Sequence, residues 1–245
     1  MKIFKEIFGR IWAIWGLIIF TASLLVVVIP ICLTFFIKEP QGTEIFRRIS
    51  KAWMHFFLTM IGCRLLIKGG EHLVKGESFV IVCNHNSFMD VPVTTPFIPG
   101  ANKTIAKKSM AKIPVFGWVY TRGAVLVDRQ SDESRRQSFE AMKQTLANGL
   151  HMVIYPEGTR NRTNEPLKAF YDGAFRLATV TEKKIIPTLL FNTNKVLPTN
   201  KFFYLWPCTL QMHFLPAVNS IGVTPKGLKE KVFKLMWDYY LLHNK

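Results

Sequence analysis

Residues 78–83 have the sequence SFVIVC, and residues 84–90 continue as NHNSFMD. The first segment is a short apolar run rich in β-branched side chains, which is typical of a buried strand. Three further runs share this character, at residues 123–127, 151–155 and 184–191. We therefore expect each of these segments to be a strand of one sheet that is covered on both faces.

Helical patterns alternate with these runs. Residues 131–148 repeat apolar side chains at helical spacing and end in Asn-Gly, and residues 170–180 form another such segment. A last helix is expected to start at Thr224–Pro225, a capping residue followed by a proline at the first helical position. Strands that alternate with helices predict an α/β domain, with a mixed, mostly parallel sheet flanked by helices.

The N-terminal segment has a different character. Residues 11–37 contain no charged side chain. As one helix they would span about 40 Å, which exceeds the roughly 30 Å of a bilayer core. Residues 44–62 combine aromatic and basic side chains at helical spacing, which favours an interfacial amphipathic helix over an ordinary core-packing one. We predict a membrane anchor at residues 1–62 and a catalytic domain at residues 63–245.

The topology of the anchor has two solutions. Basic residues flank the apolar run on both sides, and the positive-inside rule favours the cytoplasmic side for both flanks. Pro30 lies inside the run and removes one helical hydrogen bond, so a re-entrant segment could return to the same side. A straight span is the simpler alternative. The sequence leaves both open.

Composition restricts the class of partner. The 245 residues include 32 Lys plus Arg and 16 Asp plus Glu, a net charge of +16 that favours nucleic acid, anionic lipid or phosphate-rich substrates. No RRM, helix-turn-helix or zinc-finger motif is present, so we expect no nucleic-acid partner. The cysteines are far apart, which argues against a zinc site and a disulfide framework: Cys32, Cys63, Cys83 and Cys208. We expect no bound metal.

Ligands of open α/β sheets bind in the loops that follow the strands. After residues 78–83 come His85 and, five residues later, Asp90. A carboxylate that reaches back to the imidazole fixes its tautomer and leaves the other ring nitrogen free to accept a proton. The pair is therefore a candidate general base with its orienting group, although a local turn and a helix cap would use the same residues.

The loop after residues 151–155 contains Glu157, Gly158, Thr159 and Arg160. Glycine permits a tight turn, threonine offers a hydroxyl, and arginine offers a bidentate fork for phosphate. A polar surface turn with an internal Glu–Arg pair is the alternative.

Further cations lie on either side of the predicted strand at residues 123–127: Arg129 follows it, and Lys107 and Lys108 lie upstream of it. Charge runs of this kind usually form a solvated face, but near strand ends they can form an anion cradle. Several other chemistries lack their motifs. The chain has no P-loop, no G-x-G-x-x-G fingerprint and no G-x-S-x-G nucleophile elbow.

Taken together, these loops resemble the glycerolipid acyltransferase superfamily, specifically bacterial 1-acylglycerol-3-phosphate acyltransferases. The four blocks of that family occur in order between about residues 65 and 215: N-H-x-S-x-x-D at 84–90, G-x-[IV]-x-[IV]-[DR]-R at 123–129, P-E-G-T-R at 156–160, and an apolar run with a proline at 185–187. Four blocks in order are specific where each alone would be weak.

The resemblance implies transfer of a fatty acyl group from acyl-CoA or acyl-carrier protein to a lysophospholipid, with lysophosphatidic acid as the first candidate acceptor. It implies that His85 is the base and that Asp90 orients it. The acceptor phosphate would be held by Arg160, Arg129 and Lys107, with Lys108 as the alternative to Lys107. Glu157, Gly158 and Thr159 would shape that pocket. No cofactor is implied beyond the acyl donor.

The expected location is the bacterial inner (cytoplasmic) membrane, with the active site facing the cytoplasm and membrane lipids as partners. One departure from the family pattern concerns the acceptor. Many members have basic residues before the glycine of the helix after the third block, where this chain has Tyr171 and Asp172. An acyltransferase for lyso-aminolipids is therefore a near alternative, and a thioesterase or lysolipid hydrolase is a more distant one.

Overall fold

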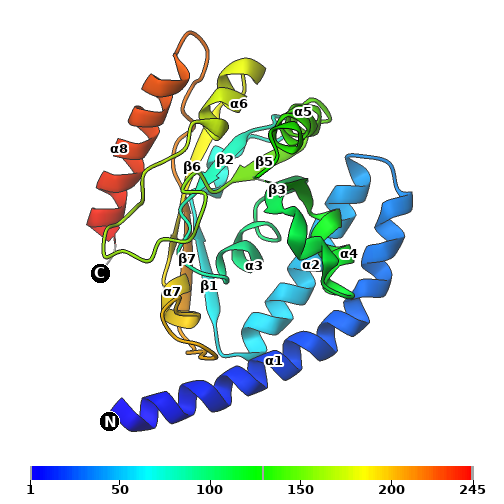
Figure 1. Cartoon of the computed structure of the whole chain (residues 1–245), viewed down its shortest axis with the longest axis vertical. Coiled ribbons are helices and arrows are strands. Elements are labelled where there is room, and N and C mark those ends of the chain that lie inside the picture. Colours follow the sequence, from blue (N-terminus) through cyan, green and yellow to red (C-terminus); the bar gives the residue numbers. More distant parts are fainter. Residues whose placement is uncertain (1, 129, 244–245) are drawn as a thin grey trace.

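The computed structural model describes residues 2–128 and 130–243. Within these residues seven strands form one sheet, in the order β1-β7-β6-β2-β5-β3-β4 (Figure 1). The strands are β1 (Arg64–Lys68), β2 (Val80–Cys83), β3 (Asn102–Lys107), β4 (Ala124–Val127), β5 (His151–Ile154), β6 (Ile185–Phe191) and β7 (Thr209–Phe214).

The strand pairing confirms the predicted fold class. Neighbouring strands from β6 across to β4 are parallel, and so are β1 and β7, whereas β6 and β7 pair antiparallel. The predicted strands correspond to β2, β4, β5 and β6, and the sequence did not predict β1, β3 or β7. Because β2, β3, β4 and β5 are mutually parallel, the loops that follow them meet at one edge of the sheet.

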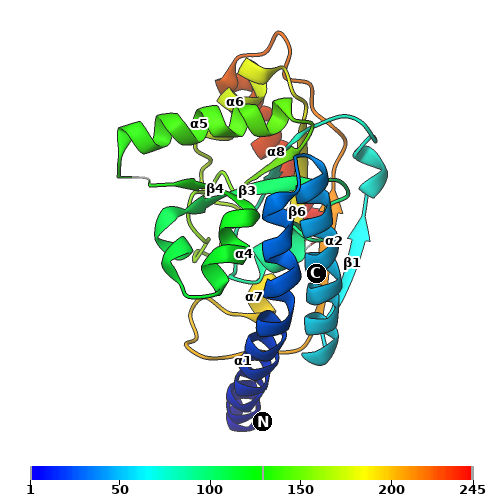
Figure 2. The same cartoon turned by 90° about the vertical axis from the view of Figure 1, so that its right-hand side faces the viewer.

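Helices cover both faces of the sheet. They are α1 (Lys2–Leu33), α2 (Gln41–Met60), α3 (Asp90–Thr94), α4 (Phe116–Arg122), α5 (Asp132–Ala147), α6 (Gly173–Thr181), α7 (Thr193–Val196) and α8 (Pro225–His243), with short 3₁₀ turns η1 (Thr34–Phe36), η2 (Gly70–His72) and η3 (Lys108–Lys112). Figure 2 shows α5 above β3 and β4, with α4 below them. The predicted helices at 131–148, 170–180 and from 224 onward correspond to α5, α6 and α8.

Alternate side chains of the central strand β2 enter two separate cores. Val80 and Val82 pack in a cluster with residues of α5, α6 and α8. Ile81 and Cys83 pack in the other cluster, with residues of α1, α2 and α3. All four side chains are fully buried, which explains why this segment is apolar throughout instead of alternating with polar residues.

The N-terminal segment forms a helical hairpin. Helix α1 continues through Pro30 to Leu33, the chain reverses after η1, and α2 returns beside α1 (Figures 1 and 2). Helix α2 contributes Trp53 and Phe57 to the same core as the sheet, whereas its Ile45 and Phe56 remain exposed. One face of α2 therefore packs in the core, as an ordinary core helix would. Another face keeps exposed apolar side chains, as an interfacial helix would.

An ion cluster around the buried Arg122 attaches the turn of this hairpin to the rest of the protein. Arg122, at the end of α4, donates from Nη1 to Glu39 Oε1 at 2.9 Å and to Thr43 Oγ1 at 3.0 Å. Its Nε donates to Thr34 Oγ1 at 3.0 Å. Lys103 of β3 also pairs with Glu39, at 3.0 Å. These contacts hold the pKa of Glu39 at about 2, because hydrogen bonds and the adjacent cations outweigh the effect of burial.

Helix α1 presents an unusual amount of apolar surface. Among the described residues one helical segment, Ile3–Phe36, is long and apolar enough to cross a membrane, and only 22% of its most apolar window is buried. Exposed fractions reach 76% for Ile3, 73% for Val26 and 87% for Phe36. A surface of this kind associates proteins with membranes.

Candidate active site

Two buried side chains, Asn84 and Ser87, fix the position of the loop after β2. Asn84 donates from its amide to the Leu190 carbonyl at 3.1 Å and accepts the Leu190 N–H at 2.7 Å, which fastens the loop to β6. Ser87 donates to the Leu197 carbonyl at 2.8 Å and accepts the N–H of Met89. Both polar side chains are buried, and these bonds satisfy them.

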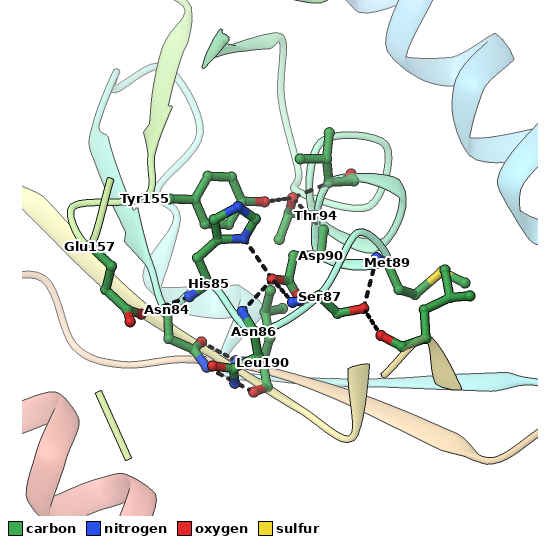
Figure 3. Close-up of polar contacts among 12 residues, drawn as sticks. Asn84, His85, Asn86, Ser87, Met89, Asp90, Thr94, Tyr155, Glu157 and Leu190 are labelled. Atoms are coloured by element: carbon green, nitrogen blue, oxygen red, sulfur yellow. Dashed lines mark hydrogen bonds and ion pairs between the residues drawn. The ribbon is translucent and has the colours of Figure 1, made fainter. Parts of the chain in front are cut away.

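His85 and Asp90 form the predicted pair. The His85 Nδ1 lies 2.7 Å from Asp90 Oδ2, and the same oxygen accepts the backbone N–H groups of Asn86 at 2.6 Å and Ser87 at 2.8 Å (Figure 3). Asp90 is fully buried. Because a carboxylate can only accept here, Nδ1 carries the proton of the neutral imidazole, and Nε2 keeps its lone pair.

An aromatic residue that the sequence did not single out supports the imidazole. The ring of Tyr155 lies 4.6 Å from that of His85, centroid to centroid, at an interplanar angle of 36°. Its hydroxyl lies 2.7 Å from Thr94 Oγ1 (Figure 3). Burial raises the pKa of Tyr155 well above its ordinary value, so the phenol stays neutral. Tyr155 therefore restricts the position of the His85 ring through this contact.

Glu157 was expected to shape the phosphate pocket, but its carboxylate binds backbone groups of two loops instead. Its side chain is buried, with Oε1 accepting the His85 backbone N–H at 2.8 Å and Oε2 accepting that of Lys168 at 3.0 Å. Burial raises the pKa of Glu157 to about 7, and the charge of Asp90 adds to this effect, while the two N–H donors oppose it. Glu157 joins the loop after β5 to the loop that holds the base.

The next two residues of this loop face the site. Gly158 has a φ of +68°, in the left-handed region that favours glycine, so the turn requires glycine at this position. The hydroxyl of Thr159 accepts a hydrogen bond from Lys168 Nζ at 2.7 Å. Lys168, which the sequence did not single out, thus places a cation beside the motif.

Arg160 lies over an aromatic ring of the other loop. Its guanidinium carbon is 3.4 Å from the centroid of the Phe88 ring. The stack joins the third motif to the first and fixes the plane of the guanidinium. Lys107, at the end of β3, has an exposed side chain, and its N–H donates to the Tyr120 hydroxyl at 3.0 Å. Arg129 lies outside the described residues.

These groups surround one cavity of about 1960 Å³. Its polar part is lined by His85, Lys107, Gly158, Thr159, Arg160 and Lys168, and Lys108, Lys112 and Arg162 line it as well. Its apolar part extends to the N-terminal hairpin, where Leu17, Phe20, Leu24, Trp53 and Phe57 line it. The predicted base His85 and the predicted cations Lys107 and Arg160 therefore line one cavity that has an apolar extension. Asp90 and Glu157 are buried and are not part of its lining, and Arg129 lies outside the described residues.

The acidic residue that departs from the family pattern is already paired. Asp172 accepts a hydrogen bond from Lys229 of α8 at 2.6 Å, on the exposed surface at the start of α6. Its charge is compensated there. Asp172 and Tyr171 are both absent from the lining of the cavity.

The chain is similar in sequence to known proteins. The family model described as Acyltransferase matches residues 64–190. Among curated proteins, the 1-acyl-sn-glycerol-3-phosphate acyltransferase of Saccharomyces cerevisiae is 31% identical over 74% of this chain and 60% of its own length. The enzyme of that name from Helicobacter pylori is 34% identical over 52% of this chain and 56% of its own length. The chain thus spans little more than half the length of these relatives.

A solved structure extends the similarity to the whole fold. The crystal structure of the 1-acyl-sn-glycerophosphate (LPA) acyltransferase PlsC from Thermotoga maritima superimposes with a TM-score of 0.83 at 19% identity, covering 97% of both chains. At this identity the match shows the fold alone. Because the superposition covers 97% of both chains, the shared fold includes the N-terminal helices.

Proposed function

The chain belongs to the acyltransferase family, whose model matches residues 64–190, and on this premise we propose that it transfers a fatty acyl group from acyl-CoA or acyl-carrier protein to the free hydroxyl of lysophosphatidic acid. The product is phosphatidic acid. The main support is the contact of 2.7 Å between the buried Asp90 and His85, which lines the same cavity as Arg160. The names of these relatives, 1-acyl-sn-glycerol-3-phosphate acyltransferases, support this acceptor.

In this mechanism His85 Nε2 accepts the proton of the acceptor hydroxyl while the hydroxyl oxygen attacks the thioester carbonyl carbon. The tetrahedral intermediate collapses with cleavage of the carbon–sulfur bond, and the imidazolium returns the proton to the departing sulfur. Asp90 stabilises the imidazolium between these steps. General base catalysis of this kind contributes about 10²- to 10⁴-fold to the rate. No metal ion and no covalent enzyme intermediate are required.

The acceptor phosphate is assigned to the cationic wall of the cavity. Arg160 offers a planar fork suited to two phosphate oxygens, and its stack on Phe88 holds that fork in one orientation. Lys168 adds a second positive charge beside Thr159. Lys107 lines the same cavity. Lys168 thereby compensates for the basic residues that the chain lacks at Tyr171 and Asp172.

The apolar extension is assigned to an acyl chain. Side chains of the N-terminal hairpin, among them Phe20, Leu24 and Trp53, line the cavity beyond the polar part. An acyl chain in that region removes apolar area from water on both sides of the contact. The apolar walls therefore favour a lipid substrate over a small soluble thioester.

The hairpin also determines how the protein meets the membrane. Near its start α1 contacts the β6–β7 connection, where Leu205 donates its N–H to the Gly9 carbonyl at 3.0 Å. Near its end Thr34 is bound by Arg122. A helix that crosses the bilayer has its ends on opposite sides, yet both ends of α1 contact the catalytic half. As in the re-entrant alternative, both flanks then lie on one side of the membrane, although α1 continues through Pro30 instead of breaking there. We therefore favour an arrangement in which α1 is embedded along one leaflet of the bacterial cytoplasmic membrane, with the active site on the cytoplasmic side.

The test is an assay of the purified protein in mild detergent with oleoyl-CoA and a panel of lysolipids, read by mass spectrometry. His85→Ala is compared with wild type and with His55→Ala, a matched control on the exposed side of α2. Phosphatidic acid from wild type and His55→Ala, but not from folded His85→Ala, supports the proposal. Near wild-type turnover by His85→Ala would remove the base assignment.

The products also separate the alternatives. Acylation of a lyso-aminolipid alone would keep the base and change the acceptor, and free fatty acid without an acylated product would indicate a hydrolase. Lys168→Met should raise the KM for lysophosphatidic acid more than it lowers kcat, because its cation binds the ground state and transition state alike. Lys226→Met, on the exposed surface of α8, is its control.

A further inference from the structure

The connection between α7 and β7 presents aromatic side chains to solvent. We call residues 197–207 the aromatic loop; its sequence is LPTNKFFYLWP. Phe202 is 89% exposed, the largest exposed fraction of any large apolar side chain in the described part of the chain, and the neighbouring Phe203 is 40% exposed. Two adjacent phenylalanine rings exposed to water do not stabilise the folded protein, so the pair indicates a surface that binds a partner.

The aromatic loop is fixed to the N-terminal part of α1. Besides the Leu205–Gly9 hydrogen bond, the ring of Tyr204 lies directly on Gly9, where an added Cβ would be 2.2 Å from the ring. Lys201 forms an ion pair with Glu6. Figures 1 and 2 both show this connection beside the first half of α1. The loop and the helix are therefore one continuous surface.

That surface includes part of the rim of the active-site cavity. Phe203, Tyr204 and Leu205 line the cavity together with His85. Phe203 has a φ of +53°, in the left-handed region that an aromatic residue rarely adopts. Such strain persists where the surrounding contacts impose it, and it is found at sites that bind ligands. In the aromatic loop the strained residue Phe203 directly follows the exposed Phe202.

The charges around the loop identify the kind of partner. Arg10 donates to the Phe202 carbonyl at 3.4 Å, and Lys5 lies 5.8 Å from the centroid of the Trp206 ring. Lys5 and Arg10 thus place two cations beside the loop, whereas Lys201 is already paired with Glu6. The same end of α1 also exposes apolar side chains, including Ile3 and Phe4. Exposed aromatic and aliphatic side chains next to basic ones fit an anionic lipid surface, where apolar groups insert and cations meet headgroups.

We propose that the aromatic loop is a second membrane-contact element, which inserts Phe202 into the same leaflet as α1 and holds the rim of the cavity at the level of the headgroups. This inference rests on the proposed function, because it assumes an enzyme that takes its acceptor from the bilayer. It adds a contact from the catalytic half, far in sequence from the N-terminal anchor. A lipid leaving the leaflet beside the loop would then meet the cavity without crossing water.

The direct test measures depth in the bilayer. A fluorophore is attached at Phe202→Cys, with Cys32 and Cys208 changed to alanine, and the protein is bound to vesicles of phosphatidylcholine and phosphatidylglycerol that contain brominated acyl chains. Val180→Cys is the matched control, because Val180 is 55% exposed on α6, at the far end of the molecule (Figure 1). Quenching at residue 202 but not at residue 180 is expected. A vesicle-bound protein with an unquenched label at residue 202 would overturn the proposal.

Activity gives a second test. Phe202→Ser should lower kcat/KM for long-chain lysophosphatidic acid in these vesicles about fivefold, as expected for the loss of one partly inserted ring. Activity on a short-chain, water-soluble lysophosphatidic acid should not change, and Phe202→Trp should restore the vesicle activity. Equal vesicle activity of Phe202→Ser and wild type would overturn the inference alone. A wild-type protein that neither binds vesicles nor transfers acyl groups would overturn the proposed function with it.

Discussion

Glu157 makes stability depend on pH in a direction opposite to that of most carboxylates. It is buried behind the active site and accepts the backbone N–H groups of His85 and Lys168. Two hydrogen bonds do not fully replace the water that the ionised carboxylate loses, and burial raises its pKa from 4.5 to about 7. The free energy of unfolding should therefore change with pH in a way that depends on Glu157. The reference variant is Glu157→Gln, whose side chain has the same shape and no proton to release.

The sign and size follow from the two pKa values. Between pH 4.5 and about pH 7 the folded protein retains a proton that the unfolded chain has released. The contribution of Glu157 is therefore most favourable below pH 4.5, declines as the pH rises, and is lost above about pH 7. Integrated over this window, the shift corresponds to roughly 3 kcal/mol.

The assay is chemical unfolding in mild detergent at a series of pH values. The free energy of unfolding of wild type, minus that of Glu157→Gln, should fall by roughly 3 kcal/mol between about pH 4.5 and about pH 8. Groups shared by both proteins cancel in this difference, including His151, whose pKa burial lowers to about 4. Glu140→Gln, on the exposed side of α5, should remain parallel to wild type. A Glu157→Gln curve that is also parallel to wild type would refute the reasoning.

Three further predictions concern the base and the hairpin. Asp90→Asn should lower kcat about 10²- to 10⁴-fold with little change in KM, because the amide cannot stabilise the His85 imidazolium; steady-state kinetics of the folded variant measure this. Tyr155→Phe should keep near wild-type kcat, while Tyr155→Leu should lose about three- to tenfold, since only the ring supports the imidazole. Arg122→Met should destabilise the protein by about 3 kcal/mol in thermal or chemical unfolding, because Glu39 loses its buried partner, and adding Glu39→Gln should recover part of that loss.

The sequence predicted the strands whose side chains are apolar on both faces. It did not predict β3, whose buried positions are occupied by Asn102, Thr104 and Ala106. The amide group of Asn102 donates to the carbonyls of Thr95 and Gly100, whereas its Oδ1 has no hydrogen-bond partner among the described residues, so the two donated bonds are what make a polar side chain tolerable at this fully buried position. Hydrophobic periodicity cannot reveal such a strand, because tertiary hydrogen bonds, not apolar burial, determine its side chains.

The same distinction applies to the site. His85 and Asp90 could be predicted because both lie in one turn, where five residues suffice to bring the carboxylate to the imidazole. Tyr155 and Lys168 could not, because their positions beside His85 and Thr159 result from the pairing of β2 with β5 and from the path of an irregular loop. Motif spacing describes local geometry, whereas contacts between loops depend on the sheet.

The acceptor illustrates why a local departure from a family pattern has to be judged in three dimensions. In sequence, Asp172 replaces a basic residue close to the third motif and argues against a phosphate. In the structure its carboxylate is paired with Lys229 outside the cavity, while Lys168 reaches the motif through Thr159. The charge that acts on a bound headgroup is set by the side chains that line the cavity, and in this lining Lys and Arg side chains outnumber the acidic Asp128. This excess of positive charge favours a phosphate-bearing acceptor over a lyso-aminolipid, in spite of the sequence around residue 172.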